Sequence, residues 1–383
     1  MVNRDRLAET FKTLAGIDSV SRSEGEISKE IQNIFESLGA DTWIDDAGDK
    51  IGGETGNLIV KFKGNTKTAP ILFNAHMDTV EPGKAVKVEL NEGIFTSDGQ
   101  TILGADDKSG IAILIEAMRT VQEKNLPFGP VEMVFTVSEE IGILGAKHFD
   151  AGCIESKYGF ALDDGDMDCI VTNSPEAIQF QIKVHGKDSH AGAEPEKGIN
   201  AIQIAGKAIA QIQTGRIDDE STCNIGLIEG GMATNIVPNL VIVKGEVRSH
   251  NRKKLKAIFE DIIAAFKDAV KNAENSTEDS LPRMEVDTEK EFPLTDIPES
   301  HPVVKLARKA AENLGRKIDL KKSGGGSDAN IFIEKGIVLG VLGTGMRDMH
   351  TVRESIRLDD MVKTVELIIE VIRVHTARSG MNS

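Results

Sequence analysis

Apolar residues recur at helical spacing near the amino terminus of the chain. The spacing from Ile27 to Leu38 predicts an amphipathic helix. Ser23 is placed to cap this helix, with Glu26 three residues later as in a capping box. Gly39 follows at the position where a helix C-terminus favours glycine. We therefore expect this helix to begin after Ser23 and to end before Gly39.

Further along, short apolar runs bounded by turn residues alternate with helical segments. The pattern predicts strands over 57–62, 70–75, 131–137 and 158–162 and a buried helix over 110–121. This strand–helix–strand order is typical of an α/β fold with a central, mostly parallel sheet flanked by helices. Such a sheet gathers the carboxyl ends of its strands, where binding sites form in folds of this class.

The pattern changes after Pro175. Residues 177–185 alternate apolar and polar positions, as a half-exposed strand does. The other elements predicted in this part are a helix over 199–213, strands over 222–227 and 237–248, a helix over 253–273 and a strand over 283–288. This β-α-β-β-α-β order is that of a split βαβ, ferredoxin-like domain.

After Pro293 the α/β pattern returns, with a helix over 302–314, a strand over 338–342 and a helix over 359–376. A chain of 383 residues is also long for a single core. We therefore predict one α/β domain, residues 1–175 and 290–383, interrupted by an inserted α+β domain, residues 176–289.

The composition of the chain indicates which kinds of partner and which location to expect. The net charge is -16 at pH 7, whereas nucleic acids and anionic membranes bind clustered Lys and Arg, so we expect neither as a partner. No apolar run reaches the roughly 18 residues of a membrane span, and the charged first 19 residues do not resemble a secretory signal. Three widely spaced cysteines, Cys153, Cys169 and Cys223, are typical of reduced thiols. We therefore expect a cytoplasmic protein.

Polar side chains follow the predicted strands, beginning with His76 and Asp78. Because side chains alternate along a strand, these two point to the same face. A carboxylate often fixes the second ring nitrogen of a metal-binding histidine, and Asp78 is a candidate for that role. Taken alone, the pair would more often be a surface turn.

Two more acidic pairs follow. Asp106 and Asp107 come after a glycine-rich approach to the predicted helix, where acids are common N-caps. Glu139 and Glu140 follow the strand over 131–137 and point to different sides, so that one can bind a metal while the other moves protons. Taken alone, adjacent glutamates usually form a solvated turn.

The last two clusters complete a set of oxygen and nitrogen ligands. Asp163 and Asp164 end the strand over 158–162, and His350 follows a glycine-rich stretch. An isolated histidine is more often structural, but the five clusters together supply two histidines and several carboxylates. Such a set suits Zn²⁺, with Mn²⁺ or Co²⁺ as alternatives. A carboxylate that bridges two ions about 3.5–4 Å apart is the usual geometry of two-metal hydrolases.

The five clusters, in this order, resemble the motifs of the zinc exopeptidases that include peptidase T, carboxypeptidase G and the succinyl-diaminopimelate desuccinylases. The matching motifs are His76-x-Asp78, Gly104-Ala105-Asp106-Asp107-Lys108, Ser138-Glu139-Glu140, Asp163 and His350. The resemblance covers essentially the whole chain. Residues 103–110 and 325–330 are most similar to the peptidase T branch.

The resemblance implies two Zn²⁺ ions per subunit and a role for each residue. Asp106 is expected to bridge the ions, with His76 and Asp163 completing one site. Glu140 and His350 are expected to complete the other site. Asp164 remains an alternative to Asp163, because the two are adjacent.

The same resemblance assigns the catalytic residues. Asp78 is expected to orient the histidine at 76, and Glu139 is expected to be the general base. His190, in the inserted domain, is expected to stabilise the oxyanion, often across a dimer interface. Without the family, His190 would be a turn histidine in a glycine-rich loop.

Substrate contacts are expected from two other regions. Asn235 and Arg248 lie in the inserted domain, and Arg248 is suited to pair with a substrate carboxylate. Gly326, Ser327 and Asp328 lie in a flexible stretch whose backbone amides can approach a ligand. The alternatives are a surface-strand arginine and a plain connecting loop.

The predicted function is an aminopeptidase that releases the N-terminal residue from tripeptides, acting as a homodimer formed through the inserted domain. Peptidase T usually carries Pro where this chain has Ala191 in His190-Ala191-Gly192. This departure leaves an N-acyl-amino-acid amidohydrolase or a carboxypeptidase of the same family as alternatives. An alternative of another class is a non-catalytic metal-binding protein, against which the intact Glu139 argues.

Overall fold

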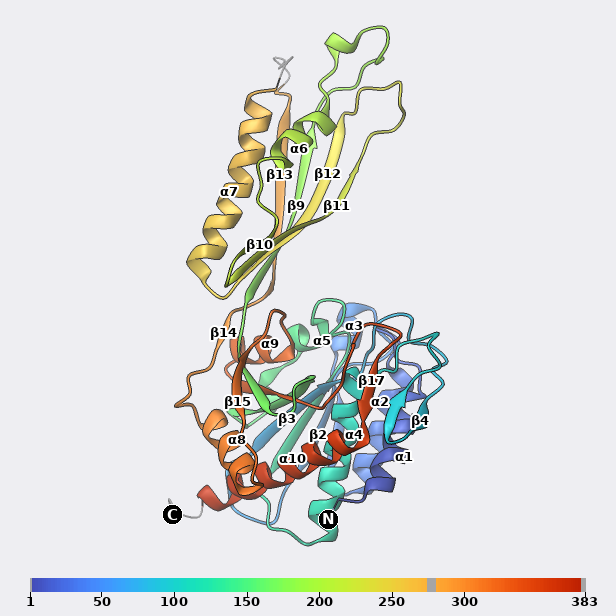
Figure 1. The fold of residues 1–383 in the computed structure, drawn as a ribbon, viewed down its shortest axis with the longest axis vertical. Coiled ribbons are helices and arrows are strands. Elements are labelled where there is room, and N and C mark those ends of the chain that lie inside the picture. The colour runs from blue at the N-terminus through green and yellow to red at the C-terminus, as the bar shows by residue number, and fades with distance from the viewer. Residues whose placement is uncertain (1, 274–279, 380–383) are drawn as a thin grey trace. The chain divides into compact units, whose positions relative to one another are not determined.

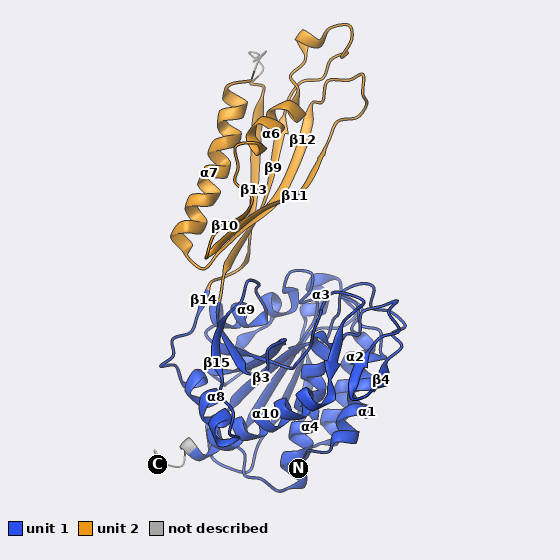
Figure 2. Cartoon of the chain, viewed as in Figure 1, with its two compact units in different colours: residues 1–173, 295–383 blue, residues 174–294 orange. Residues whose placement is uncertain are grey.

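The computed structural model describes residues 2–273 and 280–379, which form two compact units (Figures 1 and 2). Unit 1 comprises Met1–Asn173 and Thr295–Ser383, and unit 2 comprises Ser174–Leu294. The chain passes between the units at 173/174 and 294/295, compared with the predicted 175/176 and 289/290. Residues 1, 274–279 and 380–383, which the predicted domains include, lie outside the described part.

The centre of unit 1 is a nine-stranded, mostly parallel sheet of order β1-β2-β6-β3-β7-β16-β8-β14, with β15 beside β8. Its strands are β1 (Asp41–Ile44), β2 (Leu58–Phe62), β3 (Ile71–His76), β6 (Val131–Thr136), β7 (Tyr158–Asp164), β8 (Cys169–Ser174), β14 (Thr295–Asp296), β15 (Asp319–Lys322) and β16 (Val338–Gly343). The four central strands β6, β3, β7 and β16 are parallel to one another. This arrangement confirms the predicted α/β class and brings the carboxyl ends of these strands to one edge of the sheet.

Helices flank this sheet, and a small second sheet of order β17-β5-β4 lies in the same unit. These elements are α1 (Arg4–Ala15), α2 (Gly25–Ser37), α3 (Ala47–Ile51), α4 (Ala105–Glu123), α5 (Leu144–His148), α8 (Pro302–Asn313), α9 (Asp328–Glu334), α10 (Leu358–Ser379), β4 (Glu89–Asn91), β5 (Ile94–Thr96) and β17 (Ser355–Arg357). The helix α4 contacts β3 and β7 on one side and α1 and α10 on the other. Because it is covered on both sides, its residues 107–118 are all buried, including the charged Lys108 and Glu116.

The start of α2 differs from the prediction. Its N-cap is Glu24 rather than Ser23. The Glu24 carboxylate accepts hydrogen bonds from the backbone N–H and the hydroxyl of Ser138, 114 residues away. A long-range partner therefore defines this helix start, while Gly39 takes the expected left-handed conformation after the helix, with φ 79°.

Unit 2 is an antiparallel sheet of order β10-β11-β12-β9-β13 with two helices packed against it. Its elements are β9 (Glu176–His185), α6 (Ala201–Ile209), β10 (Gly215–Asp218), β11 (Ser221–Gly230), β12 (Leu240–Ser249), α7 (Arg252–Lys271) and β13 (Arg283–Phe292). The chain order is the predicted β-α-β-β-α-β with one additional short strand, β10. A separate apolar core, which includes Phe180, Val243 and Phe266, holds this unit together.

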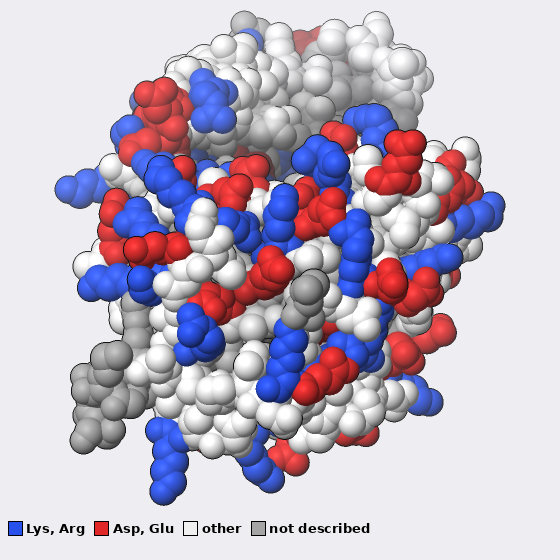
Figure 3. Space-filling model, turned by 60° about the horizontal axis from the view of Figure 1, so that its bottom comes forward, with Lys and Arg blue, Asp and Glu red and all other residues white. Residues whose placement is uncertain are grey.

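Surface charge, the cysteines and the character of the helices bear on the predicted partners and location. On the face drawn in Figure 3, the Lys and Arg side chains are interspersed with Asp and Glu. The three cysteines are free thiols. None of the helices in the described ranges combines the length and the apolar character that crossing a bilayer requires.

Candidate active site

Three of the predicted clusters lie where parallel strands end. His76 is the last residue of β3, Glu139 and Glu140 follow β6, and Asp163 is the second-last residue of β7. Because β6, β3 and β7 are adjacent, these strand ends bring side chains from distant parts of the sequence together. Asp106 reaches the same place from the first turn of α4.

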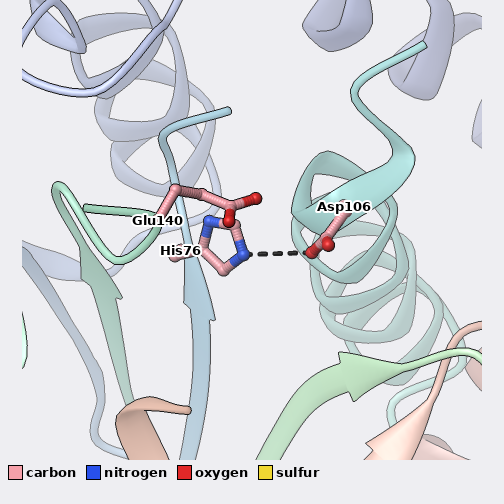
Figure 4. Close-up of side chains that lie close together, drawn as sticks. All are labelled: His76, Asp106 and Glu140. Atoms are coloured by element: carbon pink, nitrogen blue, oxygen red, sulfur yellow. Dashed lines mark hydrogen bonds and ion pairs between the residues drawn. The ribbon is translucent and has the colours of Figure 1, made fainter. Parts of the chain in front are cut away.

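The Asp106 carboxylate lies between two histidines. Its Oδ1 is 3.1 Å from His76 Nε2, and its Oδ2 is 3.3 Å from His350 Nε2. His350 Nε2 is also 3.0 Å from Glu140 Oε1, and His76 Nε2 is 4.0 Å from Asp163 Oδ1. Figure 4 shows His76, Asp106 and Glu140 pointing toward one another, and their ligand atoms lie within 4.8 Å. Asp106 thus has one histidine and one carboxylate on each side.

The structure separates Asp163 from its neighbour Asp164. The Asp164 carboxylate accepts hydrogen bonds from Lys321 Nζ at 2.9 and 3.1 Å, away from the histidines. Consecutive residues of β7 point to opposite faces, so only one of the two can face His76. The geometry favours Asp163 as the ligand.

Asp78 is buried and connects the end of β3 to the loop after β6. Its carboxylate accepts hydrogen bonds from the N–H groups of Glu139 at 2.9 Å and Glu140 at 3.2 Å, and from the Ser21 hydroxyl at 2.6 Å. His76 Nδ1 lies 2.9 Å from the main-chain oxygen of Asp78 and 3.4 Å from its carboxylate. The nearest partner of His76 Nδ1 is therefore the main-chain oxygen of Asp78, whereas the carboxylate holds the backbone of the two glutamates.

The electrostatics of the cluster suit bound cations. Burial, together with the negative charge of Asp163, raises the pKa of Glu139 well above its usual range. Burial likewise raises the pKa of Asp163, with Asp106 adding to the effect. Hydrogen bonds that His350 donates to the Asp106 and Glu140 carboxylates raise the pKa of this histidine to about 10.

Four carboxylates and two histidines therefore gather at one edge of the sheet, where His350 stays 54% exposed. Crowded, buried carboxylates are unfavourable unless positive charge compensates them. Imidazole nitrogen and carboxylate oxygen are also the ligands that Zn²⁺ accepts. The residues present fit a site for divalent cations.

His190 and Asn235 lie in neighbouring exposed loops of unit 2. The Ala191 N–H donates to the main-chain oxygen of Asn235 at 2.9 Å, and His190 Nδ1 accepts from the N–H groups of Gly192 and Ala193 at 3.2 Å. These bonds fix the histidine ring against its own loop. The catalytic role of His190 stays a prediction, as does substrate binding by Asn235.

Arg248 lies in β12, within the sheet of unit 2. Its Nε and Nη2 both donate to the Glu246 carboxylate at 3.0 Å, and its guanidinium lies 5.6 Å from the centre of the Phe292 ring. The Arg248 guanidinium therefore pairs with the Glu246 carboxylate in the two-bond geometry that was expected for a substrate carboxylate. Binding of substrate by Arg248 stays a prediction.

Asp328 lies beside the cluster, and its binding of substrate stays a prediction, as does that of Gly326 and Ser327. Its side chain is 2% exposed, and its Oδ2 accepts hydrogen bonds from Asn74 and Thr136 in β3 and β6. These bonds fix the carboxylate against the sheet through Oδ2, while the buried Oδ1 has no hydrogen-bond partner within the described residues. The neighbouring Ser327 and Gly326 precede α9, and Ser327 caps that helix, which the sequence pattern did not predict.

Sequence reasoning missed several residues that support the site, among them two near the amino terminus. Ser21 holds Asp78, and Glu24 holds Ser138, which has a positive φ of 52°. Both lie far along the chain from the residues they hold, and neither ends a strand. A single sequence carries no periodic signal for such contacts.

The chain is similar to known proteins over most of its length. The model of the peptidase family M20/M25/M40 matches residues 72–374. The chain is 42% identical over 373 residues to a Bacillus subtilis (strain 168) protein named "Uncharacterized protein YqjE", covering 97% of this chain and 99% of that protein. The crystal structure of aminopeptidase PepT from Bacillus cereus ATCC 10987 gives a TM-score of 0.88 at 40% identity and covers 98% of this chain and 99% of that one. A tripeptidase from Staphylococcus aureus subsp. aureus Mu50 gives a TM-score of 0.92 at 33% identity and covers 98% of this chain and 100% of that one.

Proposed function

We propose that this chain, which belongs to the peptidase family M20/M25/M40, is a two-metal aminopeptidase. The proposed reaction is release of the N-terminal residue from tripeptides. Family membership confirms the resemblance inferred from the sequence and the prediction of an enzyme. The named activities of the similar structures, an aminopeptidase and a tripeptidase, support this choice of substrate. The observation that carries the proposal is the position of Asp106 between two sets of ligands.

Two divalent ions, which we propose to be Zn²⁺ with Mn²⁺ or Co²⁺ as alternatives, would be held by these residues. Asp106 would contact both ions, His76 and Asp163 would hold one, and Glu140 and His350 would hold the other. When bound, such ions supply an activated water and polarise the amide carbonyl.

Glu139 would take a proton from that water and return it to the leaving amine. Burial and acidic neighbours raise its pKa, and a carboxylate with a raised pKa is a stronger base. Asp78 accepts a hydrogen bond from the backbone N–H of Glu139 and thereby fixes the position from which the Glu139 side chain extends. His190 would stabilise the negative charge that develops on the carbonyl oxygen.

We also propose that the enzyme is a homodimer formed through unit 2. Within the described residues, β11 pairs with β12 along its length but with β10 only at residues 221–223, so its remaining edge is open. Leu227 and Ile228 on this edge are 55% and 54% exposed, and Met232 just beyond it is 74% exposed. An open, apolar strand edge favours pairing with a second chain.

The positions of His190 and Arg248 within unit 2 support the same proposal. Leu240 and Arg248 lie near opposite ends of β12, and eight residues at roughly 3.4 Å each span about 27 Å. The His190 loop pairs with Ile236, beyond the Leu240 end. An extended tripeptide spans at most about 11 Å, so His190 and Arg248 of one chain are too far apart to contact the same tripeptide. Two chains can supply one residue each.

A panel of four substrates tests the proposed activity. Ala-Ala, Ala-Ala-Ala, N-acetyl-Ala-Ala-Ala and N-acetyl-Ala would be incubated with chelated enzyme, with and without added Zn²⁺, Mn²⁺ or Co²⁺. Metal-dependent cleavage of the free tripeptide alone supports the proposal. Cleavage of the N-acylated compounds instead would establish the amidohydrolase or carboxypeptidase alternative, which Ala191 keeps open.

We propose a cytoplasmic location as well. The three cysteines of the described chain are free thiols, which suits a reducing compartment. Fractionation of cells that carry the protein would test this, and recovery of the protein from outside the cytoplasm would contradict it.

A further inference from the structure

One carboxylate outside the predicted set connects two parts of the candidate metal site. Glu354 lies four residues after His350, immediately before β17, and is 1% exposed. Its Oε2 accepts hydrogen bonds from the N–H groups of Leu103 at 2.7 Å and Gly104 at 2.8 Å. Its Oε1 accepts from the N–H of Asp106 at 3.0 Å. A single side chain thus binds three of the four backbone N–H groups in residues 103–106.

One of these hydrogen bonds holds the backbone of Asp106, whose carboxylate lies between the two histidines. Backbone N–H groups bonded to a carboxylate form charge-assisted hydrogen bonds, which are about twice as strong as neutral ones. The Asp106 backbone is held by Glu354 while its carboxylate contacts His350, so one loop supplies both contacts. The relative position of Asp106 and His350 therefore depends on Glu354.

We propose that Glu354 is a positioning residue, which holds the Asp106 carboxylate between the two ligand sets and thereby sets the affinity for divalent metal ions. This inference rests on the proposed two-metal function. Glu354 acts through Asp106 and touches neither substrate nor metal. Residues that orient metal ligands typically change metal affinity by roughly 10- to 100-fold when they are replaced.

The chain offers a matched control. Glu132 is also a buried carboxylate of unit 1 that binds backbone N–H groups, those of Glu155 at 3.1 Å and Ser156 at 2.8 Å. It pairs with Leu72 in the parallel ladder, whereas His76, the predicted ligand, lies four residues further along β3. Glu132 therefore also binds a loop, at the other end of the strands, and in addition pairs with Lys61 at 2.8 Å and accepts from the Ser156 hydroxyl at 2.6 Å.

The substitution Glu354→Gln removes one acceptor oxygen and the charge while keeping the size of the side chain. Its NH₂ group would face backbone N–H groups, which releases either Asp106 or the Leu103–Gly104 pair. We expect Zn²⁺ and Mn²⁺ affinities of the chelated protein, measured by calorimetric titration, to fall roughly 10- to 100-fold. The metal concentration for half-maximal hydrolysis should rise by the same factor.

Glu132→Gln should lower the unfolding temperature without changing metal affinity. Glu354→Asp keeps the charge on a shorter side chain, and we expect it to fold with an intermediate loss of metal affinity. If Glu354→Gln does not fold, Glu354→Asp decides the matter. Wild-type metal affinity in a folded Glu354 variant would overturn the inference.

Different results would contradict the proposed function and the role of Glu354. A wild-type protein that binds no divalent ion and hydrolyses no peptide after metal addition would contradict the proposed function itself. A wild-type protein that binds metal, beside a Glu354→Gln variant of equal affinity, would contradict only the role of Glu354. Equal losses of metal affinity in the Glu132 and Glu354 variants would also contradict it, because general loosening of unit 1 would then be the cause.

Discussion

Units 1 and 2 depart from the usual distribution of residues in opposite ways. Unit 1 buries charged side chains, among them Asp78, Glu24 and Glu354. Unit 2 exposes apolar side chains, among them Leu227 and Ile228. Because most buried residues are apolar and most exposed strand edges are protected, both departures are informative.

Carboxylates serve different purposes in the two units. In unit 1 each of these carboxylates receives backbone N–H donors from a loop at the candidate site. In unit 2 the carboxylates of Asp218 and Glu220 are partly exposed and pair with Lys254 at 2.9 and 2.8 Å. Exposed ion pairs contribute little to stability, whereas a buried carboxylate must have partners and so fixes the structure around it.

The largest effect is expected from Asp106→Asn in unit 1. The amide has one acceptor oxygen and no charge, so it would lose contact with one ligand set. We expect metal affinity to fall by more than roughly 100-fold, beyond the range for residues that only orient ligands, and hydrolysis to be lost. Calorimetric titration and the tripeptide assay measure both. A variant with wild-type metal affinity would contradict the bridging role.

Glu139→Gln should separate chemistry from metal binding. Loss of a general base typically lowers the rate by roughly 10²- to 10⁴-fold. Metal affinity and the unfolding temperature should stay close to wild type, because Asp78 holds the backbone rather than the side chain of Glu139. A metal-loaded, folded variant with full activity would remove Glu139 from the mechanism.

Ile228→Asp tests the exposed edge of unit 2. A charge on the open edge of β11 should weaken pairing of two chains and shift the protein toward the monomer in sedimentation velocity. The matched control is Val286→Asp on β13, the opposite edge strand, which already carries many charges. The proposal predicts that only the β11 variant dissociates, and a wild-type protein that is strictly monomeric would contradict it.

Lys254→Ala is expected to have the smallest effect. Its two ion pairs lie at the surface of unit 2, where salt and water screen them. Thermal unfolding followed by circular dichroism should give a midpoint close to wild type. A large drop in the midpoint would contradict the view that the exposed carboxylates of unit 2 contribute little to stability.

The sequence by itself determined the class of fold and most of the candidate cluster. Apolar periodicity is a local property, so it located the central strands and the long helices. Polar residues directly after those strands identified His76, Glu139 and Glu140, because parallel strands gather their carboxyl ends at one edge. The resemblance then supplied the partition of ligands around Asp106.

Only the tertiary structure decided the rest. The geometry favours Asp163 over Asp164 because Asp163 lies on the face of β7 that meets His76, whereas Asp164 meets Lys321. The sequence cannot show which face that is, because both residues are acidic. The burial of Asp328 and the bonds of Glu354 link positions about 250 residues apart. No local spacing encodes such pairs, since they form only when the whole sheet has brought the loops together.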